Sequence, residues 1–166
     1  IGPPMEIIIN KPQEVTSPRT SPSMTSGVTS QVQEAIIKEE IEKEAMKWAM
    51  HFENEHGRIP SDVSLLNRGY DIESKDAETG EVRYIEVKGA SGNPEKREIT
   101  INEWQTAIKL GDDYYIYYVL GLKTKEGEIR IVKNPHSKLT IEEKTFNISI
   151  PGSSADEVFP LVKKND

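Results

Sequence analysis

Apolar residues recur at steps of three and four over residues 31–55, and this period is typical of an amphipathic helix. Ser30 is a suitable N-cap for the helix, and Gly57 is a suitable stop. The apolar stripe consists of Val32, Ile36, Ile37, Ile41, Ala45, Trp48 and Phe52. We therefore expect this face of the helix to pack against the core.

Glu44 lies at the edge of the stripe on a helical wheel, whereas Glu53 lies well away from it. Glu44 can therefore reach toward a site beside the sheet, and Glu53 is expected to point elsewhere. A second interpretation stays open, in which these glutamates form a solvated face that pairs with nearby lysines.

Two alternating segments, Tyr70–Lys75 and Val82–Lys88, flank a turn that contains Thr79 and Gly80, and this pattern predicts a β-hairpin. The segment before it is expected to make a turn over residues 58–61 and a short strand over Asp62–Leu66. Three neighbouring strands are therefore predicted between the first helix and the next one.

Because side chains alternate along a strand, Glu86 and Lys88 share one face and Val87 points to the other. If the turn centres on residues 78 and 79, opposed residues have numbers that sum to about 157 to 159. Asp71 then faces Glu86 or Lys88, and directly opposed residues point to the same side. This register gathers two carboxylates and one ammonium into one patch.

Thr100 and Glu103 have the spacing of a capping box, so we assign Glu103 to the start of a second helix rather than to catalysis. This helix is expected to end at Gly111, with Trp104, Ala107 and Ile108 facing inward. The run YYIYYVLGL that follows is apolar on both faces, as in a central strand covered from both sides.

The order helix, three strands, helix, strand predicts an α/β fold with a central mixed sheet flanked by helices. Residues 1–30 are rich in Ser, Thr and Pro, and we interpret them as a linker or tail from a larger protein. The domain itself is expected to span residues 31–135. A C-terminal extension with an edge strand would occupy residues 136–166.

Composition narrows the choice of function. The chain of 166 residues can form one core of ordinary size, has no cysteine, and carries a net charge of −7. No run of eighteen apolar residues and no signal peptide occur, so we expect a cytoplasmic protein without a membrane partner. The acidic balance argues against a high-affinity, freestanding nucleic-acid binder.

Two neighbouring carboxylates repel each other, and a bound hard cation is one remedy for this repulsion. Mg²⁺ suits Asp71 and Glu86 because it takes oxygen ligands and is often held by one or two carboxylates plus a substrate phosphate. Lys88 can orient or deprotonate a water, or stabilise charge that develops on a phosphate. The patch therefore has the groups needed for phosphodiester hydrolysis.

The chain resembles the NO VEIN C-terminal family over roughly residues 41–120, through the strings EKEAMKWAMHFENEHGRIPSDVSLLNRGYDIES, RYIEVKG, ITINEWQTA and GDDYYIYYV. That family is similar to the PD-(D/E)XK nucleases, whose motif matches Asp71 and Glu86-Val87-Lys88, with Tyr70 in place of the leading proline. The resemblance implies a restriction-endonuclease-like αβββαβ core.

It also implies roles for individual residues. Asp71 and Glu86 would bind Mg²⁺, or alternatively Mn²⁺, together with the backbone carbonyl of Val87, and Lys88 would be the catalytic lysine. Many members of the superfamily carry a glutamate on the first helix, and Glu44 is the candidate here.

The family is often found downstream of helicases or in prokaryotic defence proteins. The implied function is hydrolysis of DNA, with a helicase or another domain of the parent protein as partner and a homodimer left open.

Two other interpretations remain. The fold could be catalytically inactive and bind nucleic acid or dock a helicase. Alternatively, Asp71, Glu86 and Lys88 could form an ordinary cross-strand ion cluster, worth about 0.2–1 kcal/mol per pair.

Overall fold

A six-stranded mixed sheet forms the centre of the computed structural model, which describes residues 26–142, 147–152 and 155–163. The strand order is β1-β2-β3-β5-β6-β9, and only the central β3–β5 pair is parallel within this sheet. Its strands are β1 (Arg58–Asp62), β2 (Ile72–Asp76), β3 (Val82–Gly89), β5 (Tyr114–Leu120), β6 (Gly127–Lys133) and β9 (Glu157–Leu161). The predicted α/β class with a central mixed sheet is confirmed.

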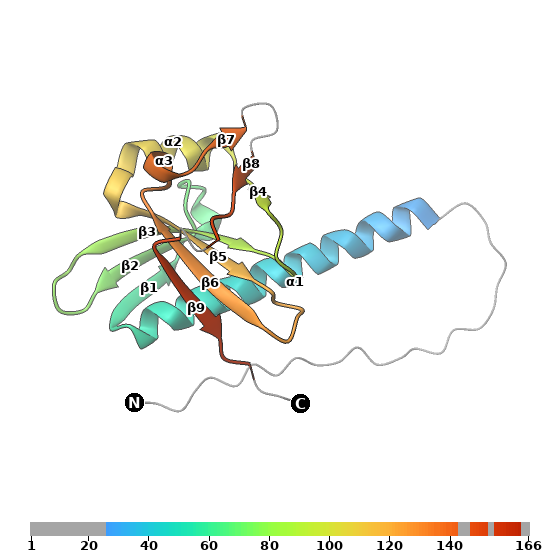
Figure 1. The fold of residues 1–166 in the computed structure, drawn as a ribbon, viewed down its shortest axis with the longest axis horizontal. Helices are drawn as coiled ribbons and strands as arrows, with labels where there is room; N and C mark the ends of the chain where they lie inside the picture. Colours follow the sequence, from blue (N-terminus) through green and yellow to red (C-terminus); the bar gives the residue numbers. More distant parts are fainter. Residues whose placement is uncertain (1–25, 143–146, 153–154, 164–166) are drawn as a thin grey trace.

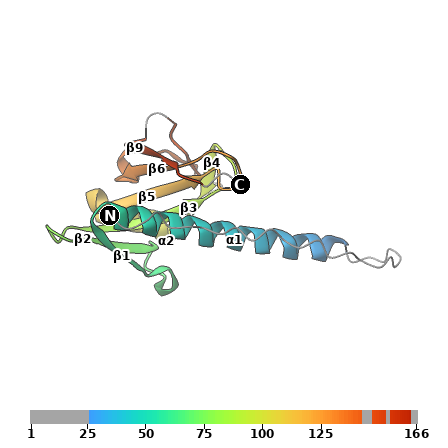
Figure 2. The ribbon, with the colours of Figure 1, turned by 90° about the horizontal axis from the view of Figure 1, so that it is seen from below.

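Helices cover both faces of this sheet (Figures 1 and 2). The long helix α1 (Ser26–Glu55) packs on one face through Ile41, Ala45 and Ala49. The other face is covered by α2 (Ile101–Leu110) and α3 (Pro135–Lys138). All seven residues of β5 are buried, as predicted for a central strand, because its side chains alternate between the two cores.

The predicted hairpin register is confirmed. Ile72 pairs with Ile85 and Lys75 pairs with Val82, so the numbers of opposed residues sum to 157. Gly80 has a φ of 76°, a left-handed value that favours glycine in the turn. The Asp76 carboxylate accepts hydrogen bonds from the next residues of the turn, Glu78 and Thr79, and fixes its shape.

The strand before the hairpin lies earlier than predicted. β1 occupies residues 58–62, where a turn was expected, and residues 64–66 form a 3₁₀ helix instead of a strand. Arg58 is buried and Ile59 is exposed, so the strand shows an inverted pattern of polar and apolar positions. Pro60 is tolerated because β1 is the edge of the sheet.

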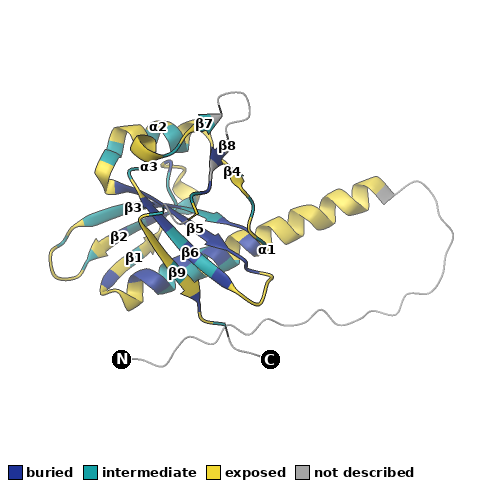
Figure 3. Cartoon of the chain, in the orientation of Figure 1, coloured by how far each residue is buried: buried dark blue, intermediate teal, exposed yellow. Residues whose placement is uncertain are grey.

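Helix α1 begins before the predicted N-cap, so Ser30 lies inside the helix and its hydroxyl donates to the Gly27 carbonyl at 3.0 Å. Its first half extends past the sheet, and Figure 3 shows this half as exposed. Val32, Ile36 and Ile37 are therefore exposed rather than packed in the core. The apolar stripe becomes buried only from Ile41 onward, where the helix reaches β3.

Strands also form in the C-terminal part of the chain. β9 pairs with β6 and forms an edge of the main sheet. A second sheet has the order β4-β8-β7, with bounds Lys96–Glu98, Asn147–Ser149 and Ile141–Glu142. Of the predicted linker, residues 26–30 are helical, and residues 1–25 lie outside the described residues.

Across residues 26–142, 147–152 and 155–163, no helix combines the length and the apolar character needed to cross a membrane.

Candidate active site

Asp71 lies where β2 and β3 separate. Its backbone N–H donates to the Ile85 carbonyl at 2.8 Å, one residue short of Glu86, which the hairpin register would place opposite it. β2 begins at Ile72 and does not extend alongside Val87. The Asp71 carboxylate takes the place of a strand there, because its Oδ2 accepts the Val87 backbone N–H at 2.9 Å. Gly69 allows this path: its φ is 84°, and a Cβ there would lie 2.2 Å from the Thr106 hydroxyl.

Lys88 lies between two carboxylates. Its Nζ is 2.8 Å from Glu86 Oε1, which belongs to the same face of β3, and 2.6 Å from Glu103 Oε2, which belongs to α2. The Glu86 and Lys88 side chains are 5% and 12% exposed, so this ion pair is largely removed from water. The predicted sharing of one face by Glu86 and Lys88 is therefore seen in the structure.

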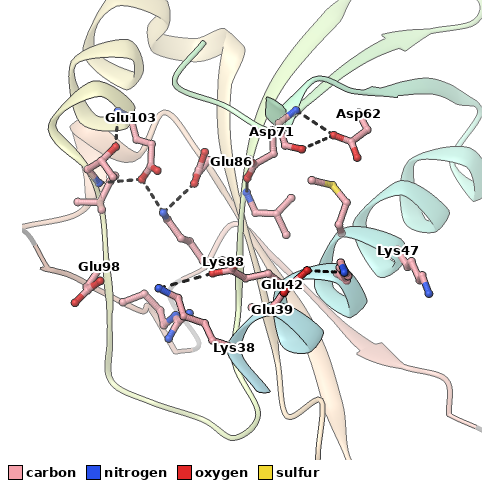
Figure 4. Close-up of a pocket in the computed structure, with 18 of the residues that line it drawn as sticks. Lys38, Glu39, Glu42, Lys47, Asp62, Asp71, Glu86, Lys88, Glu98 and Glu103 are labelled. Atoms are coloured by element: carbon pink, nitrogen blue, oxygen red, sulfur yellow. Dashed lines mark hydrogen bonds and ion pairs between the residues drawn. The ribbon is translucent and has the colours of Figure 1, made fainter. Parts of the chain in front are cut away.

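These residues form one end of an open pocket of about 1220 Å³. Figure 4 shows Glu86 and Glu103 on either side of the Lys88 ammonium, and Lys38, Glu42 and Lys47 of α1 along another wall. Both basic and acidic groups line the opening. The lysines and arginine that line the pocket besides Lys88 are Lys38, Lys43, Lys47, Lys96 and Arg97.

Burial is the main influence on the pKa values of Asp71 and Glu86. It raises the pKa of Asp71, even though the Val87 N–H and the charge of Lys88 act in the opposite direction. Burial also raises the pKa of Glu86 well above its ordinary value, and the charges of Asp71 and Glu103 add to the effect despite Lys88. Both carboxylates therefore lack full compensation for their negative charge.

Lys88 and Glu103 behave as a stable ion pair. Burial opposes the charge of Lys88, but the neighbouring Glu86 and Glu103 together raise its pKa. Burial likewise opposes the charge of Glu103, but Lys88 and the Thr100 backbone N–H lower its pKa. Lys88 is consequently an ammonium at neutral pH, and cannot be the base in that state.

The donor set suits a hard cation. The N–H and C=O of one strand residue point to the same edge, and the Val87 N–H is directed to Asp71, so the Val87 carbonyl faces that edge as well. Asp71, Glu86 and this carbonyl are oxygen donors of the kind Mg²⁺ takes. Among the described residues no three His, Cys, Asp or Glu side chains are placed to hold a metal ion, so backbone, water or substrate oxygens would complete the set.

Glu44 is not brought into this pocket. Its carboxylate lies 3.9 Å from Lys123 Nζ and is 13% exposed, and it does not line the pocket as Glu42 and Lys47 of the same helix do. The structure therefore brings together Asp71, Glu86, Val87 and Lys88 of the predicted site, and leaves Glu44 apart. The reason is the rotation of α1, which presents its charged face to the pocket.

Glu103 is the pocket residue that sequence reasoning assigned to another role. The predicted capping box is present, since Thr100 Oγ1 accepts the Glu103 N–H at 3.2 Å and Glu103 Oε2 accepts the Thr100 N–H at 3.0 Å. The same Oε2 also binds Lys88, fifteen residues away in the chain. No spacing rule links these two residues, because a loop and β4 separate them.

Comparison with known proteins gives a match to a protein family. The family model for "Protein NO VEIN, C-terminal" matches residues 41–132, which is more than half of the chain and includes Asp71, Glu86, Lys88 and Glu103. The search of curated proteins found no match, and the search of solved structures found none either.

Proposed function

The chain belongs to the NO VEIN C-terminal family, and from this premise and the geometry of its pocket we propose that it is a metal-dependent nuclease module that hydrolyses DNA phosphodiester bonds. The observation that supports the proposal best is the convergence of Asp71, Glu86 and Lys88 at one pocket end. Both carboxylates have raised pKa values there, which is the state a bound cation would relieve.

Asp71, Glu86 and the Val87 carbonyl would hold Mg²⁺ or Mn²⁺. When bound, the metal polarises a phosphoryl oxygen and helps a water to ionise. Lys88 supplies a fixed positive charge at the same place, because Glu86 and Glu103 keep it protonated. Its role is to stabilise the negative charge that develops on the phosphate during hydrolysis.

The surroundings of the site also suit a phosphate chain. Arg97 of β4 lines the pocket, and its buried Nε has no hydrogen-bond partner in the described part of the chain. Lys47 of α1 lines another part of the same opening. A guanidinium and an ammonium near the carboxylates can position the DNA backbone, although the net charge of −7 predicts weak binding by this chain alone.

The test is cleavage of linear, nicked and branched DNA with Mg²⁺ or Mn²⁺. We expect Asp71→Asn and Lys88→Met each to lower the rate by about 100-fold or more, as is typical when a group that stabilises transition-state charge is removed. The matched controls are Glu55→Gln and Lys109→Met, which change exposed side chains outside the pocket. Both controls should cleave at the wild-type rate.

Equal rates in all five proteins would contradict the assignment. Wild-type protein that binds DNA without cleaving it would replace the nuclease by the alternative, a catalytically inactive fold that binds nucleic acid or docks a helicase. A nuclease that loses activity on addition of EDTA and recovers it with Mn²⁺ would fit the proposed metal dependence.

A further inference from the structure

The Lys88 ammonium occupies a position that matters for any cation at Glu86. It lies 2.8 Å from Glu86 Oε1 and therefore already neutralises that carboxylate in part. A divalent cation bound to Glu86 would repel this ammonium, so the two cations compete for one carboxylate. Lys88 then needs another partner that keeps it charged, because its own side chain is largely buried.

Glu103 is placed to be that partner. Its Oε2 lies 2.6 Å from Lys88 Nζ, and Figure 4 shows the Lys88 ammonium bound to Glu103 and to Glu86 at once. Its position does not depend on Lys88, because the same oxygen accepts the Thr100 N–H at 3.0 Å. The start of α2 therefore fixes this carboxylate through the capping box before any pairing with Lys88.

We propose that Glu103 is a positioning residue that shares the Lys88 ammonium with Glu86, so that Lys88 does not pair with Glu86 alone and Glu86 stays available to a divalent cation. The proposal rests on the proposed function only for the location of the cation at Asp71 and Glu86. Without the charge of Glu103, Lys88 pairs with Glu86 alone and competes more strongly with the metal.

One substitution separates the two roles of Glu103. Gln is accepted at the same position of a capping box, so Glu103→Gln keeps the helix start and removes the charge that holds Lys88. We expect this variant to bind Mn²⁺ roughly tenfold more weakly than wild type by calorimetry, in the range typical for outer-shell partners of a metal site. Lys88→Met removes the competing cation and should bind Mn²⁺ more tightly.

The double variant Lys88→Met/Glu103→Gln distinguishes positioning from the simple loss of a nearby negative charge. If Glu103 acts through Lys88, the Glu103→Gln change should have no effect on Mn²⁺ affinity in the Lys88→Met background. The same tenfold loss in both backgrounds would overturn the proposal, because the effect would then be direct. Wild-type affinity in the Glu103→Gln single variant would also overturn it.

Thr100→Ala is the structural control. It removes the hydroxyl that accepts the Glu103 N–H, and keeps the Glu103 carboxylate and its bond to the Thr100 N–H. This variant should have a lower Tm and wild-type Mn²⁺ affinity, whereas a Mn²⁺ loss equal to that of Glu103→Gln would assign the effect to helix stability and overturn the proposal.

The outcomes also separate this proposal from the proposed function. Failure of the wild type to bind Mn²⁺ would remove both. Binding that follows the expected order, in a protein that cleaves no DNA, would support the role of Glu103 while contradicting the nuclease.

Discussion

Two buried glutamates, Glu53 and Glu86, lie on opposite faces of the central sheet, and their surroundings differ. Glu53 is completely buried, and both of its oxygens are satisfied. Ser74 Oγ donates to its Oε2 at 2.6 Å, Arg58 Nε lies 3.0 Å from the same oxygen, and the Tyr117 hydroxyl donates to Oε1. This carboxylate has fixed partners and no exposed surface.

Glu86 lies instead among other acids at the end of an open pocket. It shares Lys88 with Glu103, and the charge of Asp71 also acts on it. A carboxylate that is fully paired by its own fold stabilises that fold, whereas one that shares a single cation with other acids can accept a further cation. The comparison therefore separates a structural glutamate from a candidate functional one on physical grounds.

The largest expected effect is a loss of stability when Glu53, the structural glutamate, is replaced. Glu53→Ala leaves Arg58 buried with an incomplete set of partners, so we expect the free energy of unfolding to fall by about 3–5 kcal/mol. Chemical denaturation measures this loss. Glu55→Ala changes an exposed glutamate of the same helix and should remain within about 0.5 kcal/mol of wild type.

A loss below about 1 kcal/mol in Glu53→Ala would be comparable with that of a surface ion pair. It would contradict the structural role given to Glu53 in the comparison with Glu86. It would mean that the Glu53 cluster is no more important for stability than the exposed pairs of α1.

A second, smaller effect tests the close contact between β3 and α1. A Cβ on Gly89 would lie 2.7 Å from the Ala45 Cβ and 3.2 Å from the Ile41 carbonyl oxygen, where β3 crosses α1. Gly89→Ala must therefore shift the strand that carries Lys88, and we expect a loss of about 1–3 kcal/mol in the free energy of unfolding.

Gly92→Ala is the matched control, because a Cβ there has no neighbour within 4 Å among the described residues. It should leave stability within about 0.5 kcal/mol of wild type in the same denaturation experiment. Equal stability of the two variants would show that the close approach of β3 to α1 does not hold the pocket wall in place.

Local patterns predicted the candidate site better than they predicted its surroundings. The turn residues and the strict alternation of β3 fix the register, so the grouping of Asp71, Glu86 and Lys88 could be predicted from the sequence. The contact between Lys88 and Glu103 could not, because it depends on how α2 packs beside β3. In the sequence, the capping box with Thr100 was a sufficient role for Glu103, so a contact with Lys88 was not expected.

The prediction that Glu53 points away from the core was wrong for a related reason. A helical wheel treats one stripe as buried, but the C-terminal half of α1 is covered by β1 as well as by the sheet centre. The apolar residues Met46 and Met50 widen the arc there, and this is the signal that could have placed Glu53 inside. β1 was missed because its buried residue is an arginine, paired with that same Glu53.

The smallest expected effect has the opposite sign and concerns Glu86. Its folded-state pKa is raised, first by burial and then by Asp71 and Glu103, so its ionisation destabilises the fold. Glu86→Gln removes this charge and leaves Lys88 paired with Glu103. We therefore expect the Tm at pH 7 to rise by a few degrees, since each kcal/mol corresponds to about 2–4 °C for a domain of this size.

The pH dependence distinguishes this cause from better packing. A carboxyl whose pKa is higher in the folded state than in the unfolded state binds more protons when folded, so its unfavourable contribution appears as the pH rises through the folded pKa. The Tm advantage of Glu86→Gln should therefore be present at pH 7 and disappear below the unfolded value of about 4.3. An advantage that is equal at both pH values would point to packing, and a Tm lower than wild type at pH 7 would mean that Glu86, like Glu53, stabilises the fold.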